Sequence, residues 1–245
     1  MQPGRRLGTG KQAQVFEYGR DALKLYPAGS GKTAVFREAA TLALVESLDL
    51  PAPRVRGAGL FDGAWGLQMS RAEGETFAEQ LVADPARRGE IVGAMVAMHR
   101  EIHRRNGRRF APLSGRLRDN IECAAPLAAP LRQRLLDSVA AMPEGTALCH
   151  GDFHPMNIVG PPGSAVVIDW LDASSGSPEA DVSRSYLLMS LVVPDLAEAY
   201  VERYAAVAQS AREAMLRPLP VVAAARLAED VPEEVPRLLA WAEQV

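Results

Sequence analysis

A short stretch near the middle of the chain constrains the fold more than any other part of the sequence. An apolar run ends at Cys149 and leads into a His-Gly-Asp tripeptide whose aspartate is Asp152, and Asn157 follows five residues later. A second apolar run ends on Asp169. A Gly-Pro-Pro-Gly turn lies between Asn157 and Asp169, so we expect two short strands that bring these residues close together.

Asn157 and Asp169 would then offer an amide oxygen and a carboxylate oxygen beside a third group, Asp152. Mg²⁺ prefers oxygen ligands and takes one or two carboxylates together with the phosphates of a substrate. The sequence therefore predicts that Asn157 and Asp169 are metal ligands. The alternative is a buried strand that merely ends in acidic turn residues. One aspartate at a strand end would favour that alternative, but three groups at these spacings do not.

This order of groups resembles that of protein kinases, in which a catalytic Asp, an Asn five residues later and a metal-binding Asp after a strand follow one another. His-Gly-Asp and Ile-Asp-Trp replace the kinase tripeptides His-Arg-Asp and Asp-Phe-Gly. The variant is similar to the aminoglycoside phosphotransferase and choline kinase families of small-molecule kinases. The resemblance implies an α+β, bilobal, protein-kinase-like fold. Its N-terminal nucleotide-binding lobe (1–70) would be a small antiparallel sheet with one helix, and its C-terminal catalytic and substrate-binding lobe (71–245) larger and mainly helical.

A glycine turn between two expected strands near the N-terminus contains Gly8 and Gly10. Glycine lets backbone N–H groups approach phosphate oxygens because no Cβ stands in the way. The spacing fits the phosphate-covering loop of kinases, except that Ala13 replaces the third glycine. Taken alone, the motif is equally consistent with a plain hairpin. With the resemblance, it implies that Gly8 and Gly10 bind nucleotide.

Lys24 stands in a short, otherwise apolar strand, and Glu38 falls in the apolar stripe of a helix expected over 32–48. A buried charge is costly unless it is paired. We therefore predict that Lys24 and Glu38 pair, with Lys24 also reaching the nucleotide phosphates as in kinases. The alternative is a lysine whose stem lies along the surface and a glutamate at the edge of the stripe.

A strand over 64–70 is expected to pair with one over 54–60 through the Asp62-Gly63 turn. In kinases of this shape the segment after such a strand is the hinge, whose backbone groups contact the adenine. The resemblance implies that Gln68, Met69 and Ser70 are nucleotide contacts.

Two motifs suggest other sites. Gly31-Lys32-Thr33 resembles the end of a Walker A loop, but that loop needs a glycine where Tyr26 stands, so we interpret the segment as a turn before the helix. His99 and His103 are four residues apart, as zinc ligands on one helix are, yet no third ligand is evident nearby and Arg100 replaces the glutamate of that motif. We interpret His99 as a residue at the edge of the core.

The second lobe is expected to be helical over 76–82, 90–105, 116–125, 131–142 and 186–245. By resemblance to a Gly, Pro and Asp segment of the family, Asp181 is expected to cap a helix and tie down the catalytic loop. Asp172 and Glu179 either face the substrate or are solvated loop residues.

The formal net charge of −3 is unevenly spread: 17 Lys and Arg against 12 Asp and Glu in residues 1–110, and 10 against 18 in residues 111–245. This asymmetry fits a polyanionic ligand meeting a polar or cationic one. The basic run over 100–109 has few aromatic residues to stack on bases, so no nucleic-acid partner is expected. Two cysteines, no apolar leader and no membrane-length run predict a cytoplasmic protein without a membrane partner.

Together, the resemblance implies transfer of the γ-phosphoryl group of ATP, or of GTP, to a hydroxyl of a small molecule with Mg²⁺ as cofactor. Asp152 would orient the acceptor hydroxyl and accept its proton, while His150 supports the loop. Aminoglycosides, other amino alcohols, sugars, homoserine-like and nucleoside-like molecules are all possible acceptors, and the oligomeric state stays open. The rivals are a catalytically silent nucleotide-binding pseudokinase and a protein kinase. The first usually lacks one of these residues, and the second needs an activation loop and an Ala-Pro-Glu segment that we do not find.

Overall fold

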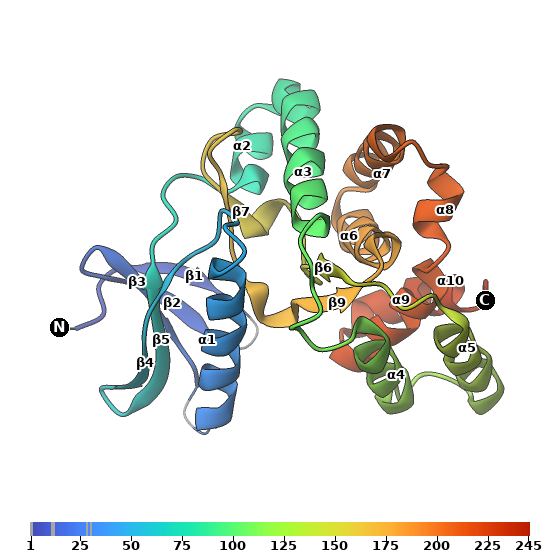
Figure 1. Cartoon of the computed structure of the whole chain (residues 1–245), viewed down its shortest axis with the longest axis horizontal. Helices are drawn as coiled ribbons and strands as arrows, with labels where there is room; N and C mark the ends of the chain where they lie inside the picture. Colours follow the sequence, from blue (N-terminus) through green and yellow to red (C-terminus); the bar gives the residue numbers. More distant parts are fainter. Residues whose placement is uncertain (1, 11–12, 28, 30) are drawn as a thin grey trace. The chain divides into compact units, whose positions relative to one another are not determined.

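The chain folds into two compact units, which are shown in the computed structural model of Figure 1. The first unit consists of Met1–Glu79 with Met156–Leu171, and the second of Gln80–Pro155 with Asp172–Val245. The structure describes residues 2–10, 13–27, 29 and 31–245.

The first unit contains a five-stranded antiparallel sheet in the order β1-β2-β3-β5-β4. Leu23 and Leu67, on neighbouring strands, are fully buried and lie on opposite faces of this sheet, since Leu67 pairs with Lys24 and Leu23 with Gln68. Lys24 lies between Val15 and Leu67 in the register, at the middle of the sheet. The strands are β1 (Arg6–Thr9), β2 (Gln14–Tyr18), β3 (Asp21–Leu25), β4 (Val55–Phe61) and β5 (Ala64–Ser70).

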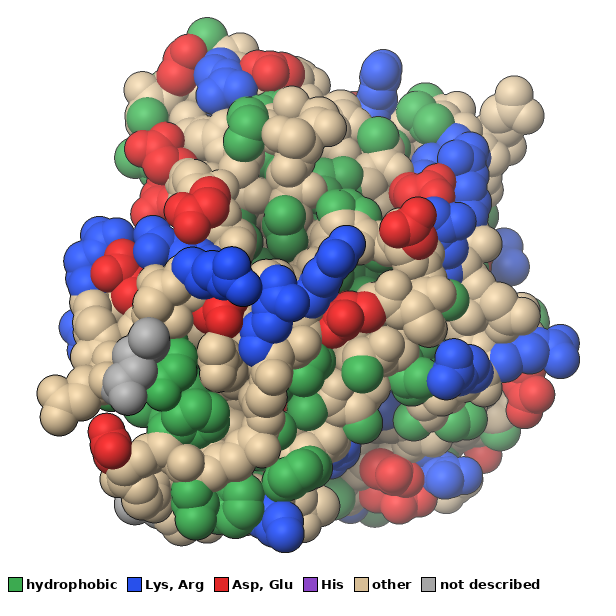
Figure 2. All heavy atoms as spheres, turned by 60° about the vertical axis from the view of Figure 1, so that its left-hand side comes forward, with side chains coloured by type: hydrophobic (Ala, Val, Ile, Leu, Met, Phe, Trp, Pro, Cys, Tyr) green, Lys and Arg blue, Asp and Glu red, His purple; other side chains and the backbone are tan. Residues whose placement is uncertain are grey.

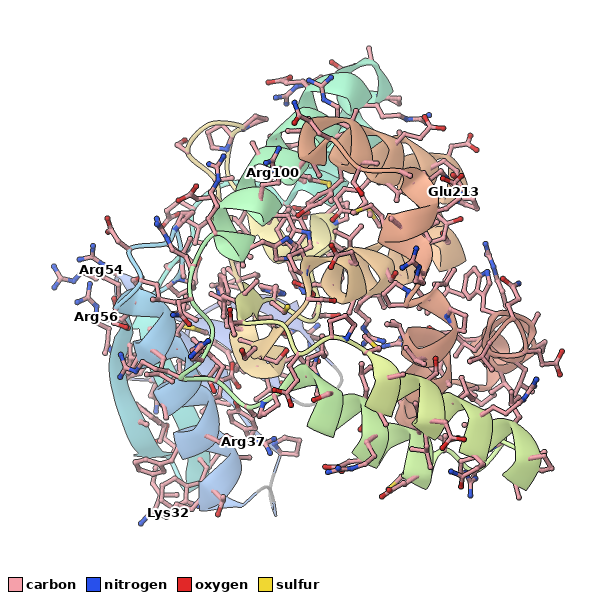
Figure 3. All side chains as sticks on the ribbon, turned by 45° about the vertical axis from the view of Figure 1, so that its right-hand side comes forward. Lys32, Arg37, Arg54, Arg56, Arg100 and Glu213 are labelled. Atoms are coloured by element: carbon pink, nitrogen blue, oxygen red, sulfur yellow. The ribbon has the colours of Figure 1, made fainter. Side chains whose placement is uncertain are left out.

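One helix, α1 (Lys32–Glu46), packs against β4 and β5 (Figure 1). Its buried residues Val35, Glu38, Leu42 and Val45 form the stripe that the sequence predicts. The helix ends two residues before the expected end, and Asp49 just beyond it adopts a left-handed backbone conformation with φ 53°. At the other end, the ammonium group of Lys32 lies over the rings of Phe36 and Trp65 (Figure 3).

The hairpin of β7 (Ile158–Val159) and β8 (Val166–Val167) belongs to the first unit, although helices of the second unit precede it in the sequence. The N–H of Val167 donates to the carbonyl of Pro51 at 2.8 Å, and that of Gly160 to the carbonyl of Glu75 at 2.9 Å. These long-range bonds pin the hairpin to the sheet unit. The functional division into lobes at residue 70 stays a prediction.

The second unit is mainly helical (Figure 1). In α3 (Arg88–His103) the buried residues Ile91, Met95 and Ile102 form an apolar stripe. A two-stranded ribbon of β6 (Ala147–Cys149) and β9 (Ser174–Gly176) packs against α3 through β6. The other helices are α2 (Phe77–Ala83), which spans the boundary between the units, α4 (Leu113–Cys123), α5 (Ala129–Ala141), α6 (Pro178–Val192), α7 (Pro194–Ala208), α8 (Arg212–Leu216), α9 (Leu219–Arg226) and α10 (Val235–Ala242).

The predicted fold class is therefore confirmed: an α+β protein with a small antiparallel sheet unit that carries one helix, and a larger, mainly helical unit. On the face drawn in Figure 2, Lys and Arg side chains are interspersed with Asp and Glu. Among the described residues, no helix combines the length and the apolar character that crossing a membrane requires.

Candidate functional site

The first unit brings Lys24, Glu38 and Asp169 into one cluster. The Nζ atom of Lys24 lies 2.8 Å from Oε1 of Glu38 and 3.0 Å from Oδ1 of Asp169. Lys24 and Glu38 are almost completely buried, whereas the side chain of Asp169 is 42% exposed. The predicted pairing of Lys24 with Glu38 is present. The second carboxylate on this lysine comes from a residue 145 positions later.

Electrostatics keep Lys24 charged in this buried position. Burial lowers the pKa of Lys24, but the carboxylates of Asp169 and Glu38 outweigh that effect, so its pKa lies above the ordinary lysine value. Glu38 is further held by the hydroxyl of Tyr26, which donates to its other oxygen. The cluster therefore presents a fixed positive charge beside a partly exposed carboxylate, which suits a phosphate group that carries a metal ion.

Asn157 and Asp169 lie at the open end of the β7–β8 hairpin, as the sequence predicts. The N–H of Ile168 donates to the backbone carbonyl of Asn157 at 2.9 Å, so the two predicted ligands follow adjoining ends of the paired strands. Asp169 has φ 61°, a left-handed conformation that Asp and Asn adopt more readily than most residues. Carboxylate and amide oxygens are ligands suited to Mg²⁺, so this pair fits the metal that the sequence implies.

The remaining predicted nucleotide contacts lie on the same sheet. The N–H of Gly10 donates to the carbonyl of Ala13 at 2.9 Å, which closes the glycine turn, while Gly8 has open space where a Cβ would stand. Gln68, Met69 and Ser70 end β5 between two neighbouring strands.

Part of the hinge segment is already hydrogen-bonded within the sheet. The N–H of Ser70 donates to the carbonyl of Arg54, and the side-chain amide of Gln68 donates to Asp21 at 2.7 Å. Nucleotide binding by Gln68, Met69 and Ser70 stays a prediction.

In the second unit, β6 ends in a tight turn at residues 150–152, which we call the catalytic turn after the role predicted for Asp152. Gly151 has φ 84°, and a Cβ at this position would approach the carbonyl oxygen of Asp172 to 2.5 Å. Only glycine fits both the conformation and the space. The N–H of Asp152 donates to Nδ1 of His150 at 3.1 Å, so His150 supports the turn from within, as predicted.

A buried carboxylate on α6 holds this turn. Oδ2 of Asp181 accepts the N–H of His150 at 2.6 Å, and Oδ1 accepts that of Gly151 at 2.8 Å. Asp181 is only 1% exposed. It therefore ties down the loop as expected, but it does not cap the helix: the cap is Ser177, whose hydroxyl accepts the N–H of Ala180.

His99 and His103 complete the surroundings of Asp181. Their Nε2 atoms lie 2.9 and 3.1 Å from Oδ2 of Asp181, and their Nδ1 atoms lie 2.6 Å from the hydroxyls of Tyr200 and Tyr204 respectively. His99 is fully buried, so its expected place at the core edge is wrong.

The structure adds Asp181 as the third group that the zinc motif lacked, and the three ligand atoms lie within 4.8 Å of one another. We interpret the cluster as hydrogen-bonded, because Oδ2 of Asp181 also accepts the N–H of His150. An ionised carboxylate only accepts, so both rings would donate from Nε2 and accept from tyrosine at Nδ1.

Acid is expected to destabilise the protein through His99. Burial, together with the neighbouring His103, lowers the pKa of His99 to about 3. The charge and the hydrogen bond of Asp181 raise this pKa but offset only part of the decrease. Between pH 6.5 and 3 the unfolded chain binds a proton that folded His99 does not. His99 therefore stabilises the fold fully above pH 6.5, and this contribution falls by about 1.4 kcal/mol per pH unit below it.

Urea denaturation at a series of pH values measures this effect. His99→Gln should show a shallower loss of stability between pH 6.5 and 4 than the wild-type protein, because glutamine does not titrate. Asp181 does not produce this window, since its pKa lies well below the ordinary value and its own contribution is lost only at lower pH. An identical pH slope in wild type and variant would contradict the assignment of His99 as neutral.

Asp152, the predicted catalytic residue, projects from this fixed turn with its side chain 28% exposed. Nε2 of His154 lies 3.4 Å from its Oδ2. Burial raises the pKa of Asp152, but His154, Arg184 and His150 outweigh it, so the pKa lies below the usual range. Asp152 is therefore a carboxylate at neutral pH. The sequence prediction missed His154, and its signal was its position two residues after Asp152, inside the motif.

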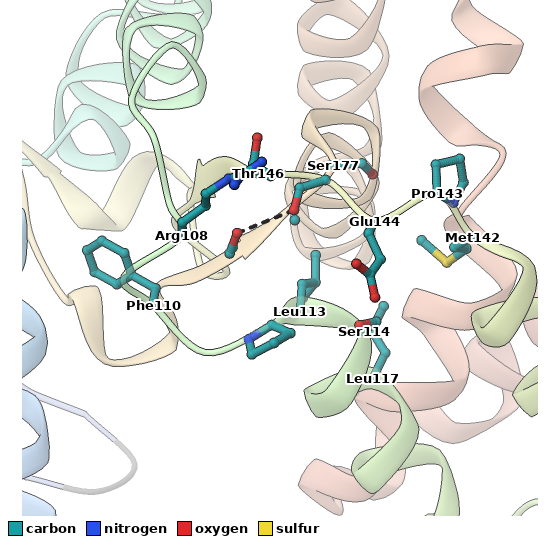
Figure 4. A pocket seen from close by; sticks show the side chains of 14 residues that line it. Arg108, Phe110, Leu113, Ser114, Leu117, Met142, Pro143, Glu144, Thr146 and Ser177 are labelled. Atoms are coloured by element: carbon teal, nitrogen blue, oxygen red, sulfur yellow. Dashed lines mark hydrogen bonds between the residues drawn. The ribbon is translucent and has the colours of Figure 1, made fainter.

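A pocket of about 440 Å³ lies elsewhere in the second unit, between α4 and the start of β6 (Figure 4). Leu113 and Leu117 of α4 form part of its wall, and the hydroxyl of Ser175 donates to the carbonyl of Gly145 across it. None of the predicted site residues lines this pocket.

Solved structures with the same fold include aminoglycoside phosphotransferases. One is a thermostable mutant of APH(4)-Ia in its apo form, with a TM-score of 0.69 and 17% identity over 98% of this chain and 92% of that chain. Another is aminoglycoside-3'-phosphotransferase of type VIII, with a TM-score of 0.64 and 18% identity over 92% and 90%.

A third is APH(3'')-Id from Streptomyces rimosus in complex with ADP and streptomycin, with a TM-score of 0.59 and 22% identity over 85% of this chain and 90% of that chain. At these identities the similarity shows the fold alone. It agrees with a kinase-like fold, which has a small sheet unit and a larger, mainly helical unit.

The sequence itself matches the family model described as the phosphotransferase enzyme family, APH, over residues 6–219. No curated protein gives a significant match. The matched region includes the glycine turn, the lysine cluster, the catalytic turn and the β7–β8 hairpin. The chain therefore belongs to the phosphotransferase enzyme family and is a small-molecule kinase with a protein-kinase-like fold.

Proposed function

We propose that this protein transfers the γ-phosphoryl group of ATP to a hydroxyl group of a small molecule. The observation that carries the proposal is the cluster in which Lys24 contacts both Glu38 and Asp169. A lysine fixed between a helix carboxylate and a partly exposed aspartate is the arrangement that kinases use to hold nucleotide phosphates. Family membership gives the cluster its chemistry, since a phosphotransferase needs a site for a phosphoryl donor.

Within the nucleotide site, we assign phosphate binding to Lys24, with Glu38 orienting it and the glycine turn of Gly8 and Gly10 covering the phosphates. Gln68, Met69 and Ser70 are assigned to the adenine edge. Asn157 and Asp169 would hold Mg²⁺, which when bound neutralises charge that develops on the transferring phosphoryl group.

We assign the orientation of the acceptor hydroxyl to Asp152. Phosphoryl transfer passes through a loose, in-line transition state, so most of the rate comes from positioning and from charge neutralisation. A carboxylate that stays ionised at neutral pH accepts a hydrogen bond from the attacking hydroxyl and so orients the hydroxyl oxygen toward the phosphoryl group. The low pKa of Asp152 makes it a weak base, which suits this orienting role better than early proton removal.

An acceptor with an amino group is our choice among the small molecules. Asp172 lies against Gly151 of the catalytic turn, and its carboxylate is 45% exposed. Its partner is Arg116, whose Nη1 is 3.3 Å away. A cationic acceptor group would compete with this guanidinium for Asp172 as the hydroxyl meets Asp152. The structures that share the fold include one bound to streptomycin, which supports testing aminoglycosides first.

A phosphoryl-acceptor screen tests the proposal. Purified protein with Mg²⁺ and either ATP or GTP is offered aminoglycosides, other amino alcohols, sugars and nucleosides, and nucleoside diphosphate release is measured. We expect release that depends on one acceptor class and a new phosphomonoester signal in ³¹P NMR. Heat-inactivated protein and omission of Mg²⁺ are the controls. Nucleotide binding without transfer to any acceptor would instead favour the pseudokinase, and transfer to protein substrates alone would favour a protein kinase.

A further inference from the structure

Two side chains on one face of α6 form hydrogen bonds with the backbone of the catalytic turn. Asp181 and Arg184 are three residues apart, so their side chains share a face of this helix. Asp181 accepts the N–H groups of His150 and Gly151. Arg184 takes the opposite polarity: its Nε donates to the carbonyl of Gly151 at 3.2 Å. Gly151, the residue that precedes Asp152, is therefore held at both its N–H and its C=O group.

Arg184 is itself held by a chain of charges from the C-terminal region. Its Nη2 lies 2.5 Å from Oε1 of Glu229, and Glu229 also accepts from Arg226. Arg226 in turn forms a two-pronged bond with Glu234, with distances of 2.8 and 2.9 Å. Such bidentate pairs fix direction as well as distance.

These four side chains are largely shielded from water. The two arginines are 13% exposed, Glu234 is 17% exposed and Glu229 is 33% exposed. A buried charge that loses its partner is far more costly than an exposed one, so the chain has one preferred arrangement. Consistently, the arginines keep the pKa of Glu229 below its usual range even though burial raises it.

We propose that Arg184 is a positioning residue for Asp152, and that Arg226, Glu229 and Glu234 fix Arg184 in its working orientation. Arg184 acts through the carbonyl of Gly151, the residue before the catalytic aspartate. Residues 226–234 thereby determine the geometry of a turn that lies more than seventy positions earlier in the sequence. The inference rests on the proposed role of Asp152.

Hydrogen exchange tests the positioning claim independently of any activity. The backbone amides of the peptide that contains residues 147–155 are followed by mass spectrometry in the wild type, in Arg184→Ala and in Glu229→Gln. We expect exchange in this peptide to become faster in both variants. Arg212→Ala is the matched control, because Arg212 forms a comparable bond of 2.7 Å to Glu198 on other helices and should leave the peptide unchanged. Unchanged exchange in Arg184→Ala would overturn the proposal.

Kinetics then separate positioning from simple loss of structure. Arg184→Ala should lower kcat by roughly 10- to 100-fold, as expected for loss of a charged hydrogen bond, with KM for ATP unchanged. Free guanidinium ion at millimolar concentration should restore part of kcat by filling the vacated space, which a misfolded variant would not allow. Equal losses in kcat and in nucleotide affinity without rescue would contradict the proposal. A wild-type protein without turnover would refute the proposed function. The hydrogen-exchange result would still decide whether Arg184 positions the catalytic turn.

Discussion

Replacing Asp152 with alanine is expected to lower kcat by roughly 10² to 10⁴-fold, the usual value of a group that accepts a proton in the transition state. The backbone of the turn should survive, because its bonds to Asp181 come from the N–H groups of His150 and Gly151. The affinity for Mg·ATP should also survive, because no phosphate or metal contact is assigned to Asp152. The measurement is steady-state ADP release with the acceptor found in the screen.

Asp137→Ala serves as the control, since it removes an exposed aspartate from α5 outside the catalytic turn. Circular dichroism of both variants shows whether the fold is kept. Asp152→Asn adds a second comparison, because the amide keeps the size of the side chain but loses its charge. Turnover within a factor of two of wild type in both Asp152 variants would show that another group aims the hydroxyl.

Loss of Asp169 should have a different effect. Without its carboxylate, Mg²⁺-dependent nucleotide binding is expected to weaken by roughly 100-fold or more, since a metal contact on phosphate is worth several kcal/mol. Isothermal titration calorimetry with a non-hydrolysable ATP analogue, with and without Mg²⁺, measures this. Binding without Mg²⁺ should change less, because Lys24 would keep its contact with the phosphates and its bond to Glu38.

The choice of substitution matters because Asp169 has φ 61°. Alanine in this conformation costs about 1–2 kcal/mol, whereas asparagine adopts it readily. Asp169→Asn therefore removes the charge without adding backbone strain and is the cleaner variant. Thermal unfolding of both variants separates the strain from the loss of binding. Wild-type Mg²⁺ dependence in Asp169→Asn would remove Asp169 from the metal site.

Local patterns in the sequence were sufficient to predict much of this structure. The apolar stripe of α1 and the apolar residues of β3 indicated that Lys24 and Glu38 are both buried, and burial of opposite charges required a pair. The turn between Asn157 and Asp169 likewise predicted the β7–β8 hairpin. In both cases the partners are close in sequence or belong to regular elements, so periodicity carries the information.

Contacts made by single side chains over long distances in sequence were not predictable in this way. No period in the sequence links Asp181 to His99, 82 positions earlier, or Arg184 to Glu229, 45 positions later. His99 lies on the buried stripe of α3, yet the stripe does not indicate which polar group it meets. The sequence also did not predict that the β7–β8 hairpin belongs to the sheet unit, because this depends on backbone hydrogen bonds to Pro51 and Glu75.

A crystal structure with Mg²⁺ and a non-hydrolysable ATP analogue would show whether these residues meet the nucleotide. We predict that the metal is bonded to the side-chain oxygens of Asn157 and Asp169, that Lys24 contacts the phosphates, and that Asp152 faces the γ-phosphate. A metal held by other residues, or a triphosphate that makes no contact with Lys24, would contradict this prediction.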